Sequence, residues 1–323
     1  MIDETTLRAG LDLTLEHSDF EGLGRLQRGK VRDSYVDEGA GRRIIVVSDR
    51  ISAFDVVLGT IPFKGQVLNG MAAHWFAASR EISDNHLISV PDAQVSVVEE
   101  CAPFPVEMVV RGYLTGSSPT SLWTYYARGE REYCGHHLPE GMTQHQRLDA
   151  PLITPTTKAE KGAHDEPVSA AQIVERGLCS AEELSRLSEM CLAMFALGTR
   201  LAADRGLILV DTKYELGRTR DGRLVFIDEI HTPDSSRYWY AESYEEAMKA
   251  GSDPRPLDKD YLRRTLIARG YSGRGAAPPL DDELRLETAR RYIEIYEQVT
   301  GRAFEPDLEP PAERIPRRLG LKT

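Results

Sequence analysis

The chain is poor in the features that mark several classes of protein. Its 323 residues include only four cysteines, none in a C-x-x-C spacing, so neither a disulfide framework nor a structural zinc site is expected. No apolar run approaches the roughly 18 residues of a membrane-spanning helix. The acidic N-terminus has no apolar stretch behind it, so no secretory signal is expected. These absences favour a reducing, cytoplasmic environment.

Positive charge is also scarce. Lysine and arginine total 40 against 51 acidic residues, which gives a net charge of −11. A protein that binds nucleic acid in general would carry the opposite balance, so neither a nucleic acid nor a membrane is an expected partner. Any phosphate that the protein handles must therefore meet a local concentration of cations.

Strand patterns dominate the first hundred residues, and helical patterns follow. Short apolar runs predict strands at 43–48, 87–90, 95–98, 106–111, 207–216 and 224–228. Helices are predicted near 69–76, from the capping box of Ser180 and Glu183 to about Leu201, and over 281–300. The stretch 135–167 is irregular, and a proline-rich coil follows residue 300. This order predicts a mixed α+β enzyme with two lobes.

The segment 211–215 is the most informative. Side chains alternate along a strand, so Asp211, Lys213 and Glu215 are predicted to share one face. If Asp221 and Gly222 form the centre of a tight hairpin turn, Glu215 lies directly opposite Asp228, with β-carbons about 5 Å apart. Two carboxylates so close need a compensating cation, and carboxylate oxygens suit Mg²⁺. Glu215 and Asp228 are therefore predicted metal ligands.

Two alternatives stay open for this segment. Lys213 alone would neutralise an exposed acidic strand face without any metal, because short motifs have a high false-positive rate. A register slip of one residue would also separate the two carboxylates.

Three further segments suit anions. Arg111 ends a strand before a predicted helix start at Ser118 and Pro119, and free N–H groups at a helix start bind anions. Two hydroxyls precede Arg237, which suits a phosphate or a carboxylate. The segment 29–32 places Lys30 and Arg32 on an extended stretch after a glycine, without forming a P-loop. Each segment taken alone has another explanation: a capped helix without a ligand after Arg111, an ordinary turn before Arg237, and a solvated basic strand edge at 29–32.

Together and in this order, the motifs closely resemble those of the SAICAR synthetase family. The resemblance runs from about Gly29 to beyond Arg237. It is carried by the segments 29–33, 48–55, 64–65, 107–117, 211–215 and 228–237. It implies a ligase of purine biosynthesis that joins L-aspartate to carboxyaminoimidazole ribonucleotide, with ATP as co-substrate and Mg²⁺ as cofactor. It also implies a two-lobed fold that binds the nucleotide between the lobes.

The resemblance assigns roles to individual positions. It implies a strand-rich ATP-binding lobe over 1–110 and a larger substrate and metal lobe over 111–323, with an extension from about 274. The implied nucleotide-binding residues are Gly29, Lys30, Arg32, Glu107 and Lys158. The implied substrate-binding residues are Asp55, Arg111, Ser117, Ser236 and Arg237, and the implied catalytic residues are Asp211 and Lys213. Separately from the resemblance, a monomer or a small homo-oligomer is expected, with the choice between them left open.

Two competing functions would use similar residues. A small-molecule kinase of the inositol-phosphate kinase type would also combine a D-x-K strand with Mg²⁺, but it would leave a phosphorylated product without needing an amine. A regulatory nucleotide-binding module would bind ATP without turnover. The joint presence of Lys213, Glu215 and Asp228 disfavours the module, and the requirement for L-aspartate separates the ligase from the kinase.

Overall fold

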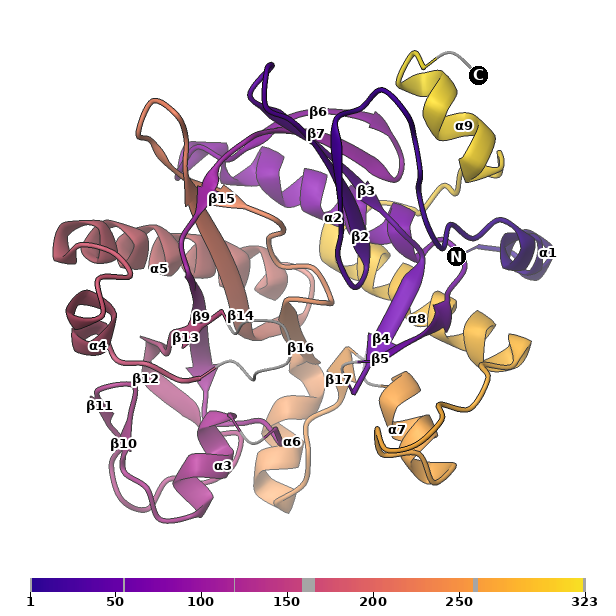
Figure 1. Cartoon of the computed structure of the whole chain (residues 1–323). Helices are drawn as coiled ribbons and strands as arrows, with labels where there is room; N and C mark the ends of the chain where they lie inside the picture. The colour runs from indigo at the N-terminus through magenta and orange to yellow at the C-terminus, as the bar shows by residue number, and fades with distance from the viewer. Residues whose placement is uncertain (1, 55, 119, 159–165, 258–260, 322–323) are drawn as a thin grey trace. The chain divides into compact units, whose positions relative to one another are not determined.

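Three separate segments of the sequence form the first structural unit. The computed structural model describes the chain except residues 1, 55, 119, 159–165, 258–260 and 322–323. Unit 1 comprises Met1–Ala77, His86–Glu100 and Asp258–Thr323, and unit 2 comprises Ala78–Asn85 and Cys101–Leu257 (Figure 1). This division differs from the predicted boundary at residue 110. The tail groups with the N-terminal strands because its helices pack there.

A five-stranded antiparallel sheet is the centre of unit 1. Its strand order is β1-β2-β3-β7-β6. The strands are β1 (Arg25–Arg28), β2 (Arg32–Asp37), β3 (Arg42–Val47), β6 (Leu87–Asp92) and β7 (Val95–Glu99). A separate hairpin is formed by β4 (Arg50–Ala53) and β5 (Val56–Thr60). The apolar runs predicted as strands at 43–48, 87–90 and 95–98 are thereby confirmed.

Helices from both ends of the chain complete unit 1. They are α1 (Glu4–Ala9), η1 (Gly10–Asp12), α2 (Lys64–Ala78), α7 (Tyr261–Ala268), α8 (Asp282–Thr300) and α9 (Pro311–Arg318). Helix α8 has the predicted bounds and is capped by Asp281, whose side chain accepts from the Leu284 N–H. The prediction of a coil after residue 300 was wrong for α9. Proline at the first turn starts this helix, since its missing N–H needs no partner there.

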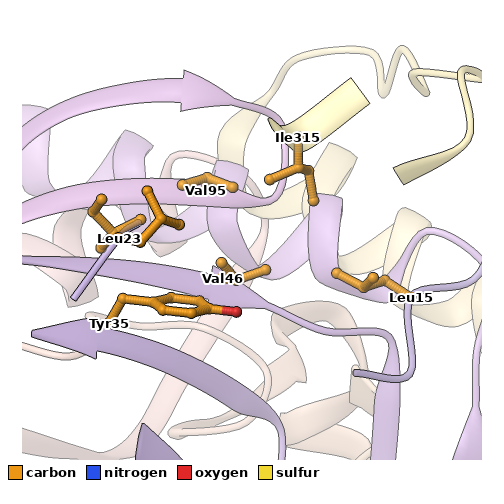
Figure 2. Packing of buried hydrophobic residues seen from close by; sticks show 7 residues of the cluster. Leu15, Leu23, Tyr35, Val46, Val95 and Ile315 are labelled. Carbon is orange, nitrogen blue, oxygen red and sulfur yellow. The ribbon is translucent and has the colours of Figure 1, made fainter. Parts of the chain in front are cut away.

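The tail contributes to the core of unit 1. Ile315 of α9 is fully buried in one apolar cluster with Leu15, Tyr35, Val46 and Val95. Figure 2 shows Ile315 pointing from α9 toward the sheet strand that carries Val95. The burial of this side chain from water stabilises the docked helix.

In unit 2, several shorter strands pair antiparallel with one long strand, β14 (Leu207–Arg218). Strands β9 (Val106–Tyr113) and β8 (Ala102–Pro103) pair with it along one edge. Strands β16 (Ser236–Tyr240) and β15 (Leu224–Ile227) pair along the other. The sheet continues through β12 (Arg147–Ile153), β13 (Thr156–Thr157) and β17 (Pro256–Leu257).

Helix α5 (Ala181–Ala203) packs on this sheet, chiefly against β14. The predicted capping box is confirmed, because Ser180 accepts from the Glu183 N–H and the Glu183 carboxylate accepts from the Ser180 N–H. The apolar stripe of α5, including Cys191, is buried. A β-carbon on Gly112 of β9 would lie 3.3 Å from the Phe195 ring of α5, so even-numbered positions of β9 face the helix. Odd-numbered positions face the other side of the sheet.

The remaining elements of unit 2 are short. They are η2 (Ser79–Glu81), α3 (Leu122–Ala127), β10 (Glu132–Tyr133), β11 (His136–His137), α4 (Ala170–Glu175) and α6 (Ala241–Ala250). Within the described part of the chain, none of the helices has the length and apolar character to span a bilayer.

Candidate active site

The face of the unit 2 sheet opposite α5 carries the charged residues that the sequence singled out. Asp211, Lys213 and Glu215 occupy alternate positions of β14, as predicted, and the strand is continuous through all three. The register places Asp211 directly between Arg111 of β9 and Arg237 of β16. Directly paired residues project on the same face, so the three side chains meet in a row across the sheet.

Asp211 binds both arginines. Nε of Arg237 donates to Oδ1 of Asp211 at 2.8 Å, and a second bond from Nη2 makes the pair bidentate. Nη1 of Arg111 lies 3.5 Å from Oδ2 of the same carboxylate. Asp211 and Arg111 are buried, whereas the Arg237 side chain is 37% exposed. One carboxylate thus orients two guanidinium groups, one of which reaches solvent.

Arg111 has further partners that the sequence analysis did not identify. Its Nε donates to the Thr154 hydroxyl at 2.8 Å. Tyr133 of the β10–β11 hairpin lies close enough for the charge of Arg111 to act on its pKa, and its hydroxyl donates to the Thr120 carbonyl at 2.6 Å. Burial raises the pKa of Tyr133 to about 12, despite the opposing charge of Arg111. Both partners come from segments distant in sequence, so no local pattern could have indicated them.

A second cluster surrounds Lys213. Its Nζ donates to Oε1 of Glu107 at 2.7 Å and lies 3.8 Å from Oε1 of Glu215. Lys158 donates to the other oxygen of Glu215. Burial lowers the pKa of Lys213, but the charges of Glu107, Glu215 and Asp228 outweigh it and raise that pKa. Lys213 is therefore a fixed cation among three carboxylates.

The predicted pairing of Glu215 with Asp228 is wrong by one residue. Glu215 pairs with Ile227, and the register continues to Arg218 opposite Leu224. The turn is a three-residue loop: the Thr219 N–H donates to the Arg223 carbonyl at 3.0 Å, and Gly222 has φ +88°. A loop that ends in a left-handed glycine shifts every pair by one position relative to a two-residue turn.

Asp228 nevertheless belongs to the same cluster. It follows β15 directly with φ +64°, a left-handed conformation that few residues other than glycine, asparagine and aspartate adopt readily. Its charge is one of those that raise the pKa of Lys213, so the two groups lie within electrostatic reach. The structure therefore keeps Glu215 and Asp228 near one lysine, although not as a cross-strand pair.

The donor set fits a magnesium ion that is completed by a ligand. Among the described residues, no three His, Cys, Asp or Glu side chains form a ready-made metal centre. Mg²⁺ is commonly held by one or two carboxylates together with substrate phosphates, and hard carboxylate oxygens suit it. Glu215 and Asp228, which both lie near Lys213, are the carboxylates that would hold the ion, with Glu215 also bonded to Lys158.

Several hydroxyl groups precede Arg237 in the sequence. The Ser236 and Thr212 hydroxyls, which pair across β16 and β14, are 2.7 Å apart. The Thr232 hydroxyl donates to Glu229 at 2.7 Å and lies 3.4 Å from the Ser235 hydroxyl. Thr212 follows Asp211 directly along β14, so the Thr212 and Ser236 hydroxyls lie on the α5 face of the sheet, opposite to Asp211 and Arg237.

The loop that carries Ser117 lies against the same arginine. Gly116 has φ +107°, and a β-carbon there would lie 2.9 Å from Nη1 of Arg237. Ser117 itself is exposed. The predicted helix start at Ser118 was wrong, because α3 begins at Leu122 after Ser121, whose hydroxyl instead accepts from the Ser118 N–H at 2.9 Å.

The predicted nucleotide-binding residues near the N-terminus lie in unit 1. Gly29 and Lys30 are exposed in the loop between β1 and β2, and Arg32 begins β2. The loop is held by the backbone: the Gly29 N–H donates to the Arg32 carbonyl at 2.8 Å. The predicted substrate-binding residue Asp55 lies outside the described residues.

Behind the charged face, an additional pair was missed by the sequence analysis. The Tyr214 hydroxyl bonds Nε2 of His231, and both side chains are buried on the α5 side of the sheet. A β-carbon on Gly198 of α5 would lie 2.2 Å from Cε1 of His231, so only glycine leaves room for this ring. Burial lowers the pKa of His231 to about 3, so the ring is neutral at ordinary pH. His231 lies in the segment between Asp228 and Arg237, and its buried hydrogen bond with Tyr214 anchors this segment to the sheet.

Known proteins match most of the chain in sequence and in fold. A family model for SAICAR synthetase matches residues 25–278. A phosphoribosylaminoimidazole-succinocarboxamide synthase of Legionella pneumophila (strain Lens) is 46% identical over 289 residues, which are 89% of this chain and 91% of the relative. The enzyme of the same name from Bacteroides fragilis (strain YCH46) is 45% identical over 311 residues, 95% of this chain and 97% of the relative. Among solved structures, a SAICAR-synthase from Saccharomyces cerevisiae complexed with SAICAR aligns with TM-score 0.78 and 31% identity, over 91% of this chain and 100% of the other.

Proposed function

The chain belongs to the SAICAR synthetase family, and from this premise we propose how its residues carry out the family's reaction. It is an ATP-dependent ligase of purine biosynthesis that joins L-aspartate to carboxyaminoimidazole ribonucleotide. The observation that supports our assignment of the site most strongly is the charged face of β14. It holds two guanidinium groups, two ammonium groups and several carboxylates on one side of a sheet.

The proposed route passes through an acyl phosphate. A carboxylate oxygen of the imidazole substrate attacks the γ-phosphorus of ATP, and the bond to the bridging oxygen of ADP breaks. The amine of L-aspartate then attacks the acyl carbon, phosphate leaves with its electron pair, and the amine nitrogen loses a proton. Both steps bring charged groups together, so catalysis depends on positioning and charge neutralisation.

Arg111 and Arg237 are proposed to bind the ribonucleotide phosphate, with Ser117 as a hydroxyl donor. The implied substrate role of Ser236, whose hydroxyl contacts Thr212 on the α5 side of the sheet, stays a prediction. Arg237 is part-exposed and already oriented by Asp211, so it is preorganised for a bidentate anion. Asp211 acts in this scheme first as a positioning residue for the two guanidinium groups. A separate proposal is that Asp211 accepts the proton from the amine. Near-normal turnover by the Asp211→Asn variant would contradict that proposal.

Lys213 and Lys158 are proposed to neutralise charge that develops on the transferring phosphoryl group. Their ion pairs with Glu107 and Glu215 hold both ammonium groups in place. Glu107 is also proposed to lie near the adenine, as the family resemblance implies. Glu215 and Asp228 would hold Mg²⁺, which when bound neutralises phosphate charge.

In unit 1, Lys30 and Arg32 are proposed to bind the ATP phosphates, together with the backbone at Gly29. Lys30 is exposed, and the carbonyl groups of its loop accept hydrogen bonds from Ser48 and Arg50. These bonds fix the backbone that carries the Lys30 side chain. The implied position of the nucleotide between two lobes stays a prediction, as do the substrate role of Asp55 and the oligomeric state.

A substrate-omission assay tests the proposed function. ADP release is measured by a coupled enzyme assay with ATP, L-aspartate and the imidazole ribonucleotide present, and then with each left out in turn. Sustained ADP release is expected only when all three are present. ADP release of equal rate without L-aspartate, with a phosphorylated product, would indicate a small-molecule kinase instead.

A further inference from the structure

We propose that the C-terminal helix α9 is a positioning element for the 29–31 loop, to which it is connected through Arg314, Gln94 and Asp49. All of these residues lie in unit 1. The inference rests on the proposed function in one respect, namely that this loop binds ATP.

Arg314 is the first member of the connection. Its side chain is fully buried, and its Nε donates to Oδ2 of Asp92, itself fully buried, at 2.8 Å. Nη1 donates to the Glu309 carbonyl at 2.9 Å, and Nη2 donates to Oε1 of Gln94 at 2.8 Å. A guanidinium taken out of water needs such partners on every side. The planar fork of arginine satisfies all three at once, which the single ammonium of lysine cannot do.

Gln94 is the second member. While its Oε1 accepts from Arg314, its Nε2 donates to Oδ2 of Asp49 and to the Val47 carbonyl, each at 3.1 Å. Gln94 is fully buried, so neither of its polar groups can exchange these partners for water. One amide therefore links the C-terminal helix to the segment that follows β3.

Asp49 is the third member. Its Oδ1 accepts from the Gly65 N–H at 2.8 Å, and its Oδ2 accepts from the Leu15 N–H at 2.7 Å. Burial raises the pKa of Asp49 to about 6, although its hydrogen bonds to Leu15, Gly65 and Gln94 act in the opposite direction. Loss of one donor therefore weakens the hold on a carboxylate that is already costly to bury.

The two neighbours of Asp49 hold the loop itself. Arg50 donates to the Gly29 carbonyl at 3.1 Å and to the Lys30 carbonyl at 2.9 Å. The Ser48 hydroxyl donates to the Val31 carbonyl at 2.7 Å. Each carbonyl of the loop is thus bonded to a residue adjacent to Asp49. A displacement of Asp49 moves Ser48 and Arg50 with it, and the backbone that presents Lys30 then loses its fixed position.

The docking of α9 does not depend on this connection alone. Ile315 is anchored in the apolar cluster of Figure 2, and Leu319 and Leu321 pack against the same cluster. Arg318 additionally bonds Oδ2 of Asp92 at 3.0 Å. A change limited to the polar connection should therefore leave the helix docked, so positioning can be separated from folding.

The test compares Arg314→Lys and Gln94→Met with a control on the same helix, Arg317→Ala. Arg317 is 62% exposed and pairs with Glu309 outside the connection. Hydrogen exchange is followed by mass spectrometry over peptides that contain the loop and residues 48–50, well below the melting temperature of each variant. KM for ATP, for L-aspartate and for the imidazole ribonucleotide is measured on the same full-length proteins.

We expect faster exchange at 28–32 and 48–50 in both test variants. We also expect KM for ATP to rise about 3- to 10-fold, the effect of one lost buried hydrogen bond, with the other two KM values unchanged. The control should match the unmodified protein. Unchanged exchange in the loop, with only a lower melting temperature, would overturn the inference. Faster exchange with unchanged KM for ATP would confirm that α9 positions the loop. It would also show that the loop is not part of the proposed ATP site.

Discussion

Asp211 of β14 accepts a hydrogen bond from Nε of Arg237, its direct partner on β16, at 2.8 Å. The same carboxylate faces Arg111 from the opposite edge of the strand. A strand in the interior of an antiparallel sheet can hold one side chain between two cross-strand neighbours, and β14 uses this geometry to fix two guanidinium groups. The predictions below depend on this face and on the residues that support it.

The first prediction concerns Arg237→Lys. Lysine keeps the charge but loses the fork that binds Asp211 and a phosphate in two places. We expect KM for the imidazole ribonucleotide to rise about 10- to 100-fold, as for a lost bond to a charged group, with KM for ATP unchanged. Steady-state kinetics measures both. Arg255→Lys is the matched control, because Arg255 is an exposed arginine of unit 2 that pairs with Glu242. Equal effects of the two changes would contradict the assignment.

The second prediction concerns the metal. Glu215→Gln keeps the shape of the side chain and removes its charge. We expect the Mg²⁺ concentration that gives half-maximal activity to rise at least about 10-fold, because Mg²⁺ prefers charged oxygen ligands. Titration of activity with Mg²⁺ at saturating substrates measures this. Glu246→Gln, an exposed position on α6, should leave the titration unchanged. An unaltered Mg²⁺ requirement in Glu215→Gln would exclude Glu215 as a ligand.

The third prediction concerns pH and His231. Burial lowers the pKa of His231 to about 3, whereas histidine in an unfolded chain titrates near about 6.5. Below pH 6.5 the unfolded chain binds a proton that the folded state does not, so this group makes stability fall as pH falls. The loss is about 1.4 kcal/mol per pH unit down to about pH 3.

Urea unfolding at pH 7 and pH 5 checks the pH prediction. The free energy of unfolding of the unmodified protein minus that of His231→Gln should decrease by roughly 2 kcal/mol between the two pH values. Subtraction cancels other titrating groups, including Asp49, whose raised pKa acts in the opposite direction. A difference independent of pH would show that His231 titrates alike in both states.

The fourth prediction concerns Gly198. Replacement of glycine by alanine inside a helix ordinarily stabilises by about 1 kcal/mol. Here the new β-carbon would lie 2.2 Å from Cε1 of His231, and overpacking of a buried site costs typically about 1–3 kcal/mol. We therefore expect Gly198→Ala to destabilise the protein. In a His231→Asn background, where the smaller side chain gives room, the same change should be neutral or stabilising. Destabilisation of equal size in both backgrounds would contradict the steric explanation.

Local patterns predicted the elements of the site better than its contacts. The alternation of Asp211, Lys213 and Glu215 placed all three on one face because the period of a strand is fixed. The capping box at Ser180 located the start of α5 because both of its partners lie within one turn. In contrast, the Asp221-Gly222 step fits both a two-residue and a three-residue hairpin loop, and the choice between them shifts the register by one residue.

Contacts between distant segments could not be predicted from such patterns. The bond of Lys158 to Glu215 joins residues 57 positions apart, and only the family resemblance brought Lys158 into the site. Helix α9 was missed because its prolines suggested a coil. Its stability comes from tertiary contacts of Arg314 and Ile315, which no local propensity encodes.

The central claim is that a carboxylate of the imidazole substrate is phosphorylated before the amine of L-aspartate displaces phosphate. It is tested most directly with substrate whose carboxylate carries ¹⁸O. The phosphate released during turnover is analysed by mass spectrometry. The account predicts that each phosphate carries one oxygen from the substrate carboxylate. Phosphate free of the label, formed at the same rate as the amide product, would contradict it.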